Sequence, residues 1–359
     1  MTYDVVVVGL GGVGSATAAA LARRGQRVLG LDRHAPVHDQ GASHGETRIV
    51  RKAYYEGAGY VPLLHRAYDL WDELGLLTRT GGLFLGASDS RVLSGSLATA
   101  QQWGLAHELL DADEVHRRFP ALTPPAGVIG LLEADAGVVS PEAAVAAQLD
   151  RAARAGADLR HEEPVTSWSA DAAGVRVTTA LRTYDAGAIV LAPGRWAPEL
   201  LPDLPVPLRV EPRTMHWFEP ACDGGGFVPG RFPVWIWERP DGSTPYGVPD
   251  VGSGVKASVH HSTLRPAGGW SGADVAAMLA PLLPGLGDRV RRSAPCAYTL
   301  TPDEHYVVGR HPGYDRVLVA CGLSGHGFKL TPVLGEALAD LAVDGVTSYD
   351  LGLFDPQRS

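Results

Sequence analysis

Three glycines near the start of the chain have the spacing of a nucleotide-binding turn. Gly9, Gly11 and Gly14 form a Gly-x-Gly-x-x-Gly motif directly after the apolar run Tyr3–Val8. The first glycine allows a tight turn, the second lets the backbone approach a pyrophosphate, and the third lets helix and strand pack closely. Asp32 ends the next apolar run, where its carboxylate can accept hydrogen bonds from ribose hydroxyls. The motif predicts a dinucleotide site and does not separate NAD from FAD.

A second glycine-rich turn lies in the sequence VLVACGLSGHGFK at 317–329. An apolar run ends in glycines and a helical pattern follows, as in the first motif. The backbone N–H groups of such a turn can face the pyrimidine edge of a flavin, where negative charge builds up on reduction. The alternative is a purely structural connection between a strand and a helix.

One cysteine and four cations are the remaining candidates for chemistry. Cys296 stands in CAYTLTPDEH, and a lone cysteine is usually a small buried hydrophobic residue. Arg48 and Arg51 occur in HGETRIVR, Lys256 in GSGVKASVH, and Lys329 closes the second glycine-rich turn. Cations are mostly solvated surface residues. One that faces inward from a strand needs a partner such as a substrate carboxylate, a flavin or a water.

The elements that position these residues follow from the hydrophobic periodicity. The run before Gly9, a helix at 13–24 and a strand at 27–31 predict a βαβ unit with parallel strands. A polar segment at 35–60 predicts a loop over a ligand. Further strands are predicted at 81–85, 158–165, 175–179, 188–191 and 317–320, and helices at 62–76, 141–155, 275–283 and 331–343. Alternating runs at 215–219, 234–238 and 254–260 predict antiparallel strands.

This order predicts an α/β fold with two interleaved domains. A Rossmann-like, parallel-sheet domain that binds the cofactor is expected from 1–78, 139–205 and 297–359. An antiparallel-sheet (α+β) substrate domain is expected from 79–138 and 206–296. Parallel strands need covering helices on their faces, whereas antiparallel strands can be joined by short turns, and this explains the change of pattern between the segments.

Composition excludes several classes of partner. The chain has 359 residues and a formal charge of −9 without a basic block, which argues against nucleic acid. Three cysteines, Cys222, Cys296 and Cys321, have neither disulfide-framework nor zinc-site spacing, so no metal is expected. No apolar run approaches the ~18 residues of a membrane helix, and no secretory signal is visible. A cytoplasmic enzyme is the expectation.

Taken together, these motifs resemble the monomeric sarcosine oxidase family of flavoproteins, which includes N-methyltryptophan oxidase and pipecolate oxidase. The resemblance runs in order along nearly the whole chain. Its motifs are the first glycine turn, SHGETRIVR at 43–51, YVPL at 60–63, GRW at 194–196, GSGVKAS around Lys256, Cys296 with TPDEH, and GLSGHGFK at 322–329. The last two are the most specific.

The resemblance implies FAD as cofactor, bonded through its 8α-methyl carbon to the sulfur of Cys296. Gly9, Gly11, Gly14 and Asp32 would hold the ADP half, and His44, Thr47 and Arg48 would lie along the isoalloxazine. The complete set of cofactor-contacting residues implied by the resemblance is Gly9, Gly11, Val13, Gly14, Asp32, Arg33, Ser43, His44, Thr47, Arg48, Val165, Gly194, Trp196, Cys296, Gly322, Gly325, His326, Gly327, Phe328 and Lys329.

The resemblance also implies the reaction. A secondary or cyclic amino acid, such as an N-methyl amino acid, is oxidised at its C–N bond to an imine that water hydrolyses, and O2 becomes H2O2. Arg51 and Lys329 would clamp the substrate carboxylate, and Lys256 would promote the reaction with oxygen. Catalytic roles would fall to Lys256, Arg48, His44, Tyr246 and His260, with Ile236 and Tyr246 beside the substrate. A monomer is expected.

The strand 234–238 departs from the family by being more aromatic, because Trp235 and Trp237 flank Ile236, and Met215-His216-Trp217 likewise replaces small residues. We therefore expect a substrate bulkier than sarcosine, with core packing of the tryptophans as the alternative. Two other functions stay open. A nicotinamide-dependent dehydrogenase explains Gly9–Asp32 but gives no role to Cys296 or Lys256. A non-catalytic dinucleotide-binding protein treats the cations as surface charge.

Overall fold

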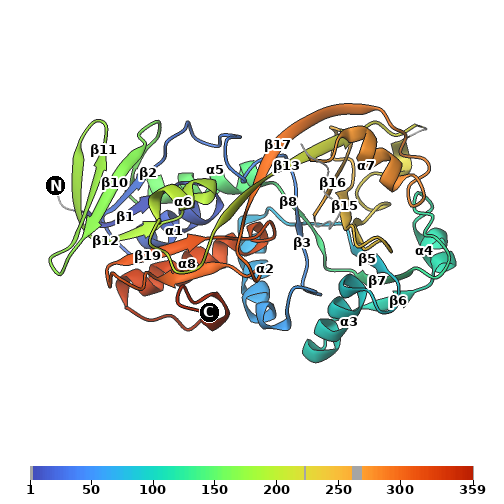
Figure 1. The fold of residues 1–359 in the computed structure, drawn as a ribbon, viewed down its shortest axis with the longest axis horizontal. Helices are drawn as coiled ribbons and strands as arrows, with labels where there is room; N and C mark the ends of the chain where they lie inside the picture. The colour runs from blue at the N-terminus through green and yellow to red at the C-terminus, as the bar shows by residue number, and fades with distance from the viewer. Residues whose placement is uncertain (1–2, 222–223, 261–268, 359) are drawn as a thin grey trace.

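The computed structural model describes residues 3–221, 224–260 and 269–358, so Cys222 lies outside the described residues. Its first sheet is mainly parallel (Figure 1). In spatial order it contains β10 (Val165–Ala170), β11 (Val175–Thr179), β12 (Thr183–Leu191), β1 (Tyr3–Val8), β2 (Val28–Leu31) and β9 (Asp158–Arg160), while β19 (Val317–Cys321) pairs with β12 and β18 (Val307–Arg310) with β19. The pairs of β1 with β2 and β12, of β2 with β9, and of β12 with β19 are parallel. The predicted βαβ unit is confirmed.

Helices cover this sheet, and small residues where the helices meet allow their backbones to pack closely. The main helices here are α1 (Gly12–Arg23), α2 (Val61–Leu74), α5 (Pro141–Arg154) and α8 (Thr331–Val343). A Cβ added to Gly335 in α8 would come within 2.7 Å of Ala16, so α8 and α1 meet backbone to backbone. The Ser140 hydroxyl caps α5, with Pro141 as its first residue.

The second sheet is built from two separate pieces of the chain and lies at the right of Figure 1. Its order is β17 (Val290–Leu300), β13 (Arg209–Phe218), β16 (Val255–Val259), β15 (Pro245–Val248), β14 (Val234–Trp237), β5 (Gly82–Gly86), β7 (Ile129–Glu133) and β6 (Glu108–Leu110). All pairs are antiparallel except β14 with β5, which run parallel and join the two pieces. β13 and β17 are long and extend toward the first sheet (Figure 1).

The remaining elements connect or cover the sheets. A small third sheet consists of β3 (Arg48–Val50), β8 (Gly137–Val139) and β4 (Thr78–Arg79). The other helices are α3 (Arg91–Trp103), α4 (Ala112–Arg118), α6 (Ala197–Leu200) and α7 (Gly272–Leu279). Among the described residues, no helix combines the length and the apolar character needed to cross a membrane.

Several predicted boundaries differ from the observed ones. The helix expected at 275–283 spans Gly272–Leu279, because Ser271 and Asp274 form a capping box that starts it earlier. The strand expected at 158–165 is two elements, β9 and β10, which lie at opposite edges of the first sheet. The expected loop at 35–60 contains β3. The division into two domains stays a prediction, and its boundary at 296/297 falls inside β17.

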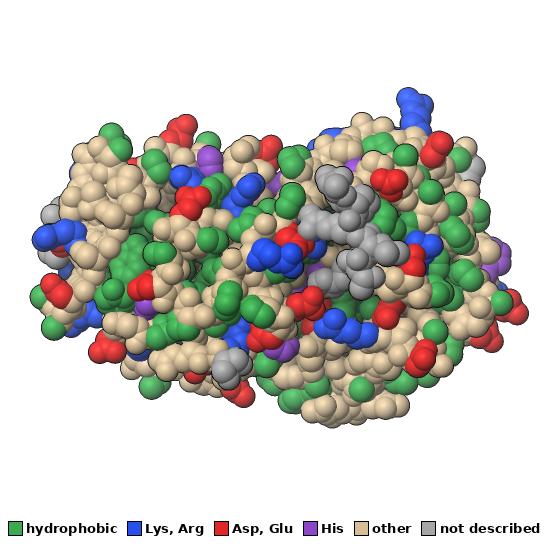
Figure 2. All heavy atoms as spheres, viewed as in Figure 1, with side chains coloured by type: hydrophobic (Ala, Val, Ile, Leu, Met, Phe, Trp, Pro, Cys, Tyr) green, Lys and Arg blue, Asp and Glu red, His purple; other side chains and the backbone are tan. Residues whose placement is uncertain are grey.

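Acidic and basic side chains are mixed among the described residues on the face of the molecule seen in Figure 2. The described residues contain no group of three His, Cys, Asp or Glu side chains that could hold a metal ion.

Candidate active site

A single long cavity runs from the first sheet to the second and is lined by nearly all of the predicted site residues. The exceptions are Gly14 and His44. The predicted residues that line it are Gly9, Gly11, Val13, Asp32, Arg33, Ser43, Thr47, Arg48, Arg51, Val165, Gly194, Trp196, Ile236, Tyr246, Lys256, His260, Cys296, Gly322, Gly325, His326, Gly327, Phe328 and Lys329. Residues that are up to 320 positions apart in the sequence therefore meet in one space.

The end of the cavity beside β1 and α1 has the geometry of a nucleotide turn. Gly9 has φ +87°, and a Cβ on Gly14 would lie 1.7 Å from the carbonyl oxygen of Gly9. Gly14 therefore serves helix–strand packing and does not reach the cavity. Burial opposes ionisation of Asp32, but hydrogen bonds from His38 and from the backbone N–H groups of His34 and Leu10 lower its pKa. The carboxylate at this end is an anion at neutral pH.

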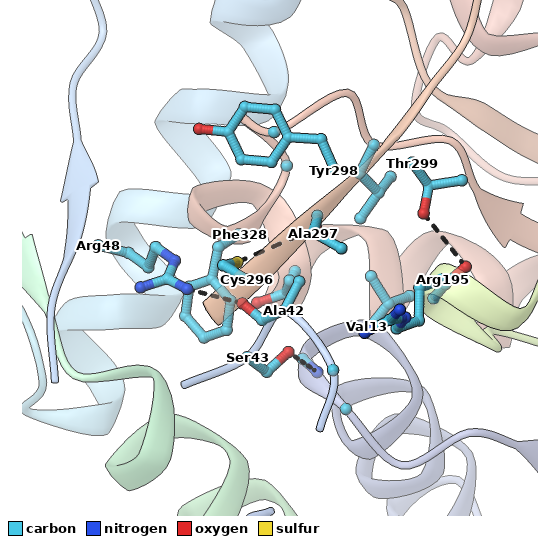
Figure 3. A pocket seen from close by; sticks show the side chains of 18 of the residues that line it. Val13, Ala42, Ser43, Arg48, Arg195, Cys296, Ala297, Tyr298, Thr299 and Phe328 are labelled. Carbon is cyan, nitrogen blue, oxygen red and sulfur yellow. Dashed lines mark hydrogen bonds between the residues drawn. The ribbon is translucent and has the colours of Figure 1, made fainter. Parts of the chain in front are cut away.

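Cys296 lies near the middle of the cavity, on β17. Figure 3 shows it bordering the same space as Arg48 from β3 and Phe328 from the second glycine-rich turn. Its sulfur lies 4.0 Å from the carbonyl oxygen of Ala297, and the thiol is half-buried. A sulfur in this position is open to the cavity and accessible to a bound group.

Two buried polar atoms in the 44–47 segment have no protein partner among the described residues. These are Nε2 of His44 and Oγ1 of Thr47. Burial, together with the positive charge of Arg48, lowers the pKa of His44, so its ring is neutral. Buried polar atoms are rarely left unpaired in folded proteins. A polar ligand such as a flavin dinucleotide fits the glycine cradle and the unpaired Oγ1 of Thr47, which lines the cavity.

Lys256 enters the cavity from β16 and is held by backbone carbonyl groups. Its Nζ donates to the oxygen of Gly45 at 2.8 Å and to that of Thr47 at 2.5 Å. Arg48 also donates to Thr47 O, at 2.8 Å, and to Ala42 O. Burial and the neighbouring Arg48 lower the pKa of Lys256 well below its ordinary value.

Arg51 and Lys329 lie together in the part of the cavity next to Tyr54. Arg51 forms an ion pair with Glu56 (Nη2–Oε2 2.6 Å), and both side chains are almost fully buried. Lys329 donates to the carbonyl oxygen of His326 at 2.6 Å and to the Tyr54 hydroxyl at 3.3 Å. Burial and the positive charge of Arg51 lower the pKa of Lys329 to about 7.

Glu56 and Tyr55 are site residues that sequence reasoning missed. Both line the cavity, and the Tyr55 hydroxyl is buried with no partner among the described residues. Burial and the nearby Glu56 raise the pKa of Tyr55 well above its ordinary value, so it is a neutral hydrogen-bond donor. The available signal was the sequence YYEG at 54–57, shortly after Arg51, since a buried arginine needs a carboxylate close by.

The sheet that carries Lys256 also carries the predicted substrate residues Ile236 and Tyr246. Ile236 on β14 pairs in register with Tyr246 on β15. A hydrogen bond of 3.0 Å joins Nδ1 of His260 and the Tyr298 hydroxyl, and the His260 ring lies edge-on to Tyr246. The structure thus brings Ile236, Tyr246 and His260 together with the cations.

The aromatic residues expected to enlarge the substrate pocket do not line it. Trp235 and Trp237 pack in a core cluster with Phe218 and Val275, because alternate residues of a strand face opposite sides of the sheet. Ile236 alone of the three faces the cavity, and Met215 does so while His216 and Trp217 do not. Trp235, Trp237, His216 and Trp217 therefore do not support the expectation of a bulkier substrate.

Comparison with known proteins agrees over the full length. The profile of the FAD dependent oxidoreductase (DAO) family matches residues 4–341. The chain is 46% identical to monomeric sarcosine oxidase of Streptomyces avermitilis, covering 99% of this chain and 98% of that protein. It is 38% identical to N-methyl-L-tryptophan oxidase of Salmonella heidelberg, covering 100% and 99%.

Solved structures give the same result. NikD, described as an unusual amino acid oxidase essential for nikkomycin biosynthesis, superposes with a TM-score of 0.86 at 28% identity, covering 99% of this chain and 98% of that one. Glycine oxidase from Geobacillus kaustophilus gives 0.82 at 25% identity, covering 100% and 99%. The matching profile, the full-length relatives and the glycine cradle lead to one conclusion: the chain belongs to the DAO family of FAD-dependent oxidoreductases.

Proposed function

We propose that this protein is an FAD-dependent oxidase of secondary or cyclic amino acids, with N-methyl amino acids as the leading class. The observation that carries the proposal is that one cavity contains both the nucleotide turn and a buried group of cations near Cys296. The sarcosine and N-methyltryptophan oxidases that the chain resembles are named for such substrates. A nicotinamide dehydrogenase is not favoured, because it would leave Cys296 and Lys256 without a role.

The residues that we propose to hold FAD are supported by the geometry of the cavity. The turn at Gly9 and Gly11 and the anionic Asp32 are suited to the ADP half, while Thr47 offers its unpaired Oγ1 to the ring system. The place of His44 along the ring stays a proposal from the resemblance, since His44 does not line the cavity. When bound, FAD accepts the electrons of the amine and delivers them to oxygen. We propose that the Cys296 sulfur is bonded to the 8α-methyl carbon of the cofactor.

Arg51 and Lys329 are proposed to bind the substrate carboxylate. Arg51 offers a planar fork of donors and Lys329 a point charge. Because Glu56 already occupies one edge of the Arg51 guanidinium, a bound carboxylate shares or displaces that pair. Ile236 and Tyr246 then border the side chain and the N-methyl group, and this placement orients the reacting C–H bond toward the cofactor.

Lys256 is proposed to assist the reduction of O2 to H2O2. A fixed positive charge in a site without bulk water stabilises negative charge that develops next to it. We also propose that the protein is a monomer. We propose the cytoplasm as its location, since three cysteines without disulfide spacing suit a reducing compartment.

The test is a peroxide-release screen with the purified protein over sarcosine, N-methyltryptophan, pipecolate and proline. We expect a yellow protein whose colour stays with the acid-precipitated pellet, and H2O2 from at least one of these amines. A colourless protein that binds NADH would contradict the proposal. A yellow supernatant above a colourless pellet would show that FAD is the cofactor but that it is not bonded to Cys296.

A further inference from the structure

The loop that contains Gly45, Glu46 and Thr47 has an unusual backbone. Gly45 has φ +95° and Glu46 has φ +67°, so a glutamate lies in the left-handed region next to a glycine. Residues other than glycine avoid this region, and they remain there only where the surroundings hold them. The contacts of the 45–47 loop must therefore hold its backbone in this conformation.

The loop supplies both carbonyl groups that hold Lys256. The ammonium group donates to Gly45 O and Thr47 O, and Lys256 makes no ion pair with a carboxylate among the described residues. Its position in the cavity thus depends on where these two oxygens are. Nothing else in the proposed function accounts for how the loop is fixed.

A carboxylate at the start of α5 fixes the loop from one side. Oε1 of Glu142 accepts the backbone N–H of Gly45 at 2.6 Å and that of Glu46 at 3.0 Å. Burial opposes the charge of Glu142, but hydrogen bonds from backbone N–H groups lower its pKa, so the carboxylate is ionised. The 45–47 loop thus supplies both the two N–H groups that bind Glu142 and the two carbonyl oxygens that bind Lys256.

The side chain of Glu46 fixes the loop from the other side, against the second sheet. It accepts hydrogen bonds from Trp217 Nε1 at 2.9 Å, from Ser253 Oγ at 3.0 Å and from Arg292 Nη2 at 2.7 Å. Trp217 pairs in register with both Lys256 and Arg292. The same patch of sheet that carries Lys256 therefore also holds the loop that binds it.

We propose that Glu142 and Glu46 are positioning residues for Lys256: Glu142 holds the 45–47 loop from helix α5 and Glu46 ties it to the second sheet, so that the loop carbonyls aim the ammonium group into the cavity. This inference rests on the proposed function, in which Lys256 assists the reaction with oxygen. Neither glutamate lines the cavity, so neither touches substrate or cofactor. Because both loop carbonyls bind Lys256, we expect the main effect of the two glutamates on the step that needs Lys256.

The test compares Glu142→Gln, Glu46→Gln and Lys256→Met, each purified as the full-length holoenzyme. Hydrogen–deuterium exchange of a peptide covering 43–50 reports the loop itself. Stopped-flow measurements separate reduction by substrate without air from reoxidation by O2. We expect faster amide exchange in both glutamate variants and reoxidation slowed about tenfold or more, with the rate of reduction within about twofold of the wild type.

A double-mutant cycle separates positioning from a general structural role. If the glutamates act through Lys256, Glu142→Gln slows reoxidation in the wild type and adds nothing in the Lys256→Met background. The matched control is Asp150→Asn, which removes one carboxylate from the exposed face of the same helix, where it pairs with Arg154. It should change neither exchange at 43–50 nor either rate.

Two results would overturn the inference: equal slowing by Glu142→Gln with and without Lys256, or faster loop exchange with unchanged reoxidation in both glutamate variants. Failure of the proposed function is recognised separately, by absence of flavin or of peroxide in the wild type. A reoxidation rate unaffected by Lys256→Met would likewise remove the role of the lysine. If one variant folds poorly, the other tests the opposite side of the same clamp.

Discussion

Substrate binding is expected to depend on pH through Lys329. Burial and the charge of Arg51 lower its pKa to about 7, so the free protein loses this positive charge as the pH rises through neutrality. A bound carboxylate favours the ammonium form and raises the pKa again. Below about pH 7 the charge is already present and affinity is constant, whereas above it binding must take up a proton.

The size of the effect follows from linkage. Above the free pKa, the dissociation constant of a carboxylate ligand increases about tenfold per pH unit, until the pKa in the complex is reached. Between about pH 7 and pH 9 this amounts to as much as ~100-fold, or about 2.7 kcal/mol. Arg51 does not contribute, because the pKa of its guanidinium is raised by Glu56 despite burial and it stays charged.

The assay is isothermal calorimetry with propionate, a carboxylate without a nitrogen to oxidise, in buffers of different ionisation enthalpy. We expect proton uptake near zero at about pH 6 and approaching one proton per ligand at about pH 8.5. Lys329→Met should bind more weakly at low pH and show neither proton uptake nor pH dependence. An affinity of the wild type that is constant from pH 6 to pH 9, or a pH dependence that survives in Lys329→Met, would refute this reasoning.

Three further predictions concern other parts of the cavity. Cys296→Ser should release its flavin into the supernatant on acid precipitation and have the intact mass of the bare chain, whereas the wild type keeps both colour and added mass. Glu56→Gln leaves Arg51 buried without its partner and should cost about 3 kcal/mol of stability, seen as a lower midpoint of thermal unfolding that added propionate partly restores. Ile236→Ala should raise kcat/KM for N-methyltryptophan relative to sarcosine, while Trp237→Phe should lower the unfolding midpoint and leave that ratio unchanged, because the two side chains lie on opposite faces of β14.

Much of the first sheet could be predicted because its signals are local. The strand Tyr3–Val8, the glycine turn after it and the Ala-rich helix are each predicted by a pattern of a few consecutive residues, and all three are confirmed. The second sheet was less predictable. The parallel pairing of β14 with β5 joins residues about 150 positions apart, and no local pattern specifies such a partner.

The glycine spacing by itself predicted a dinucleotide site, and the resemblance to the sarcosine oxidase family implied FAD and most of the residues that line the cavity. Only the tertiary structure decided which groups neutralise or hold those cations. Glu56 beside Arg51, and the loop carbonyls beside Lys256, depend on how separate chain segments pack. The same holds for the tryptophans of β14, because composition shows that a strand is aromatic, whereas the packing of the sheet decides which face its aromatic side chains occupy.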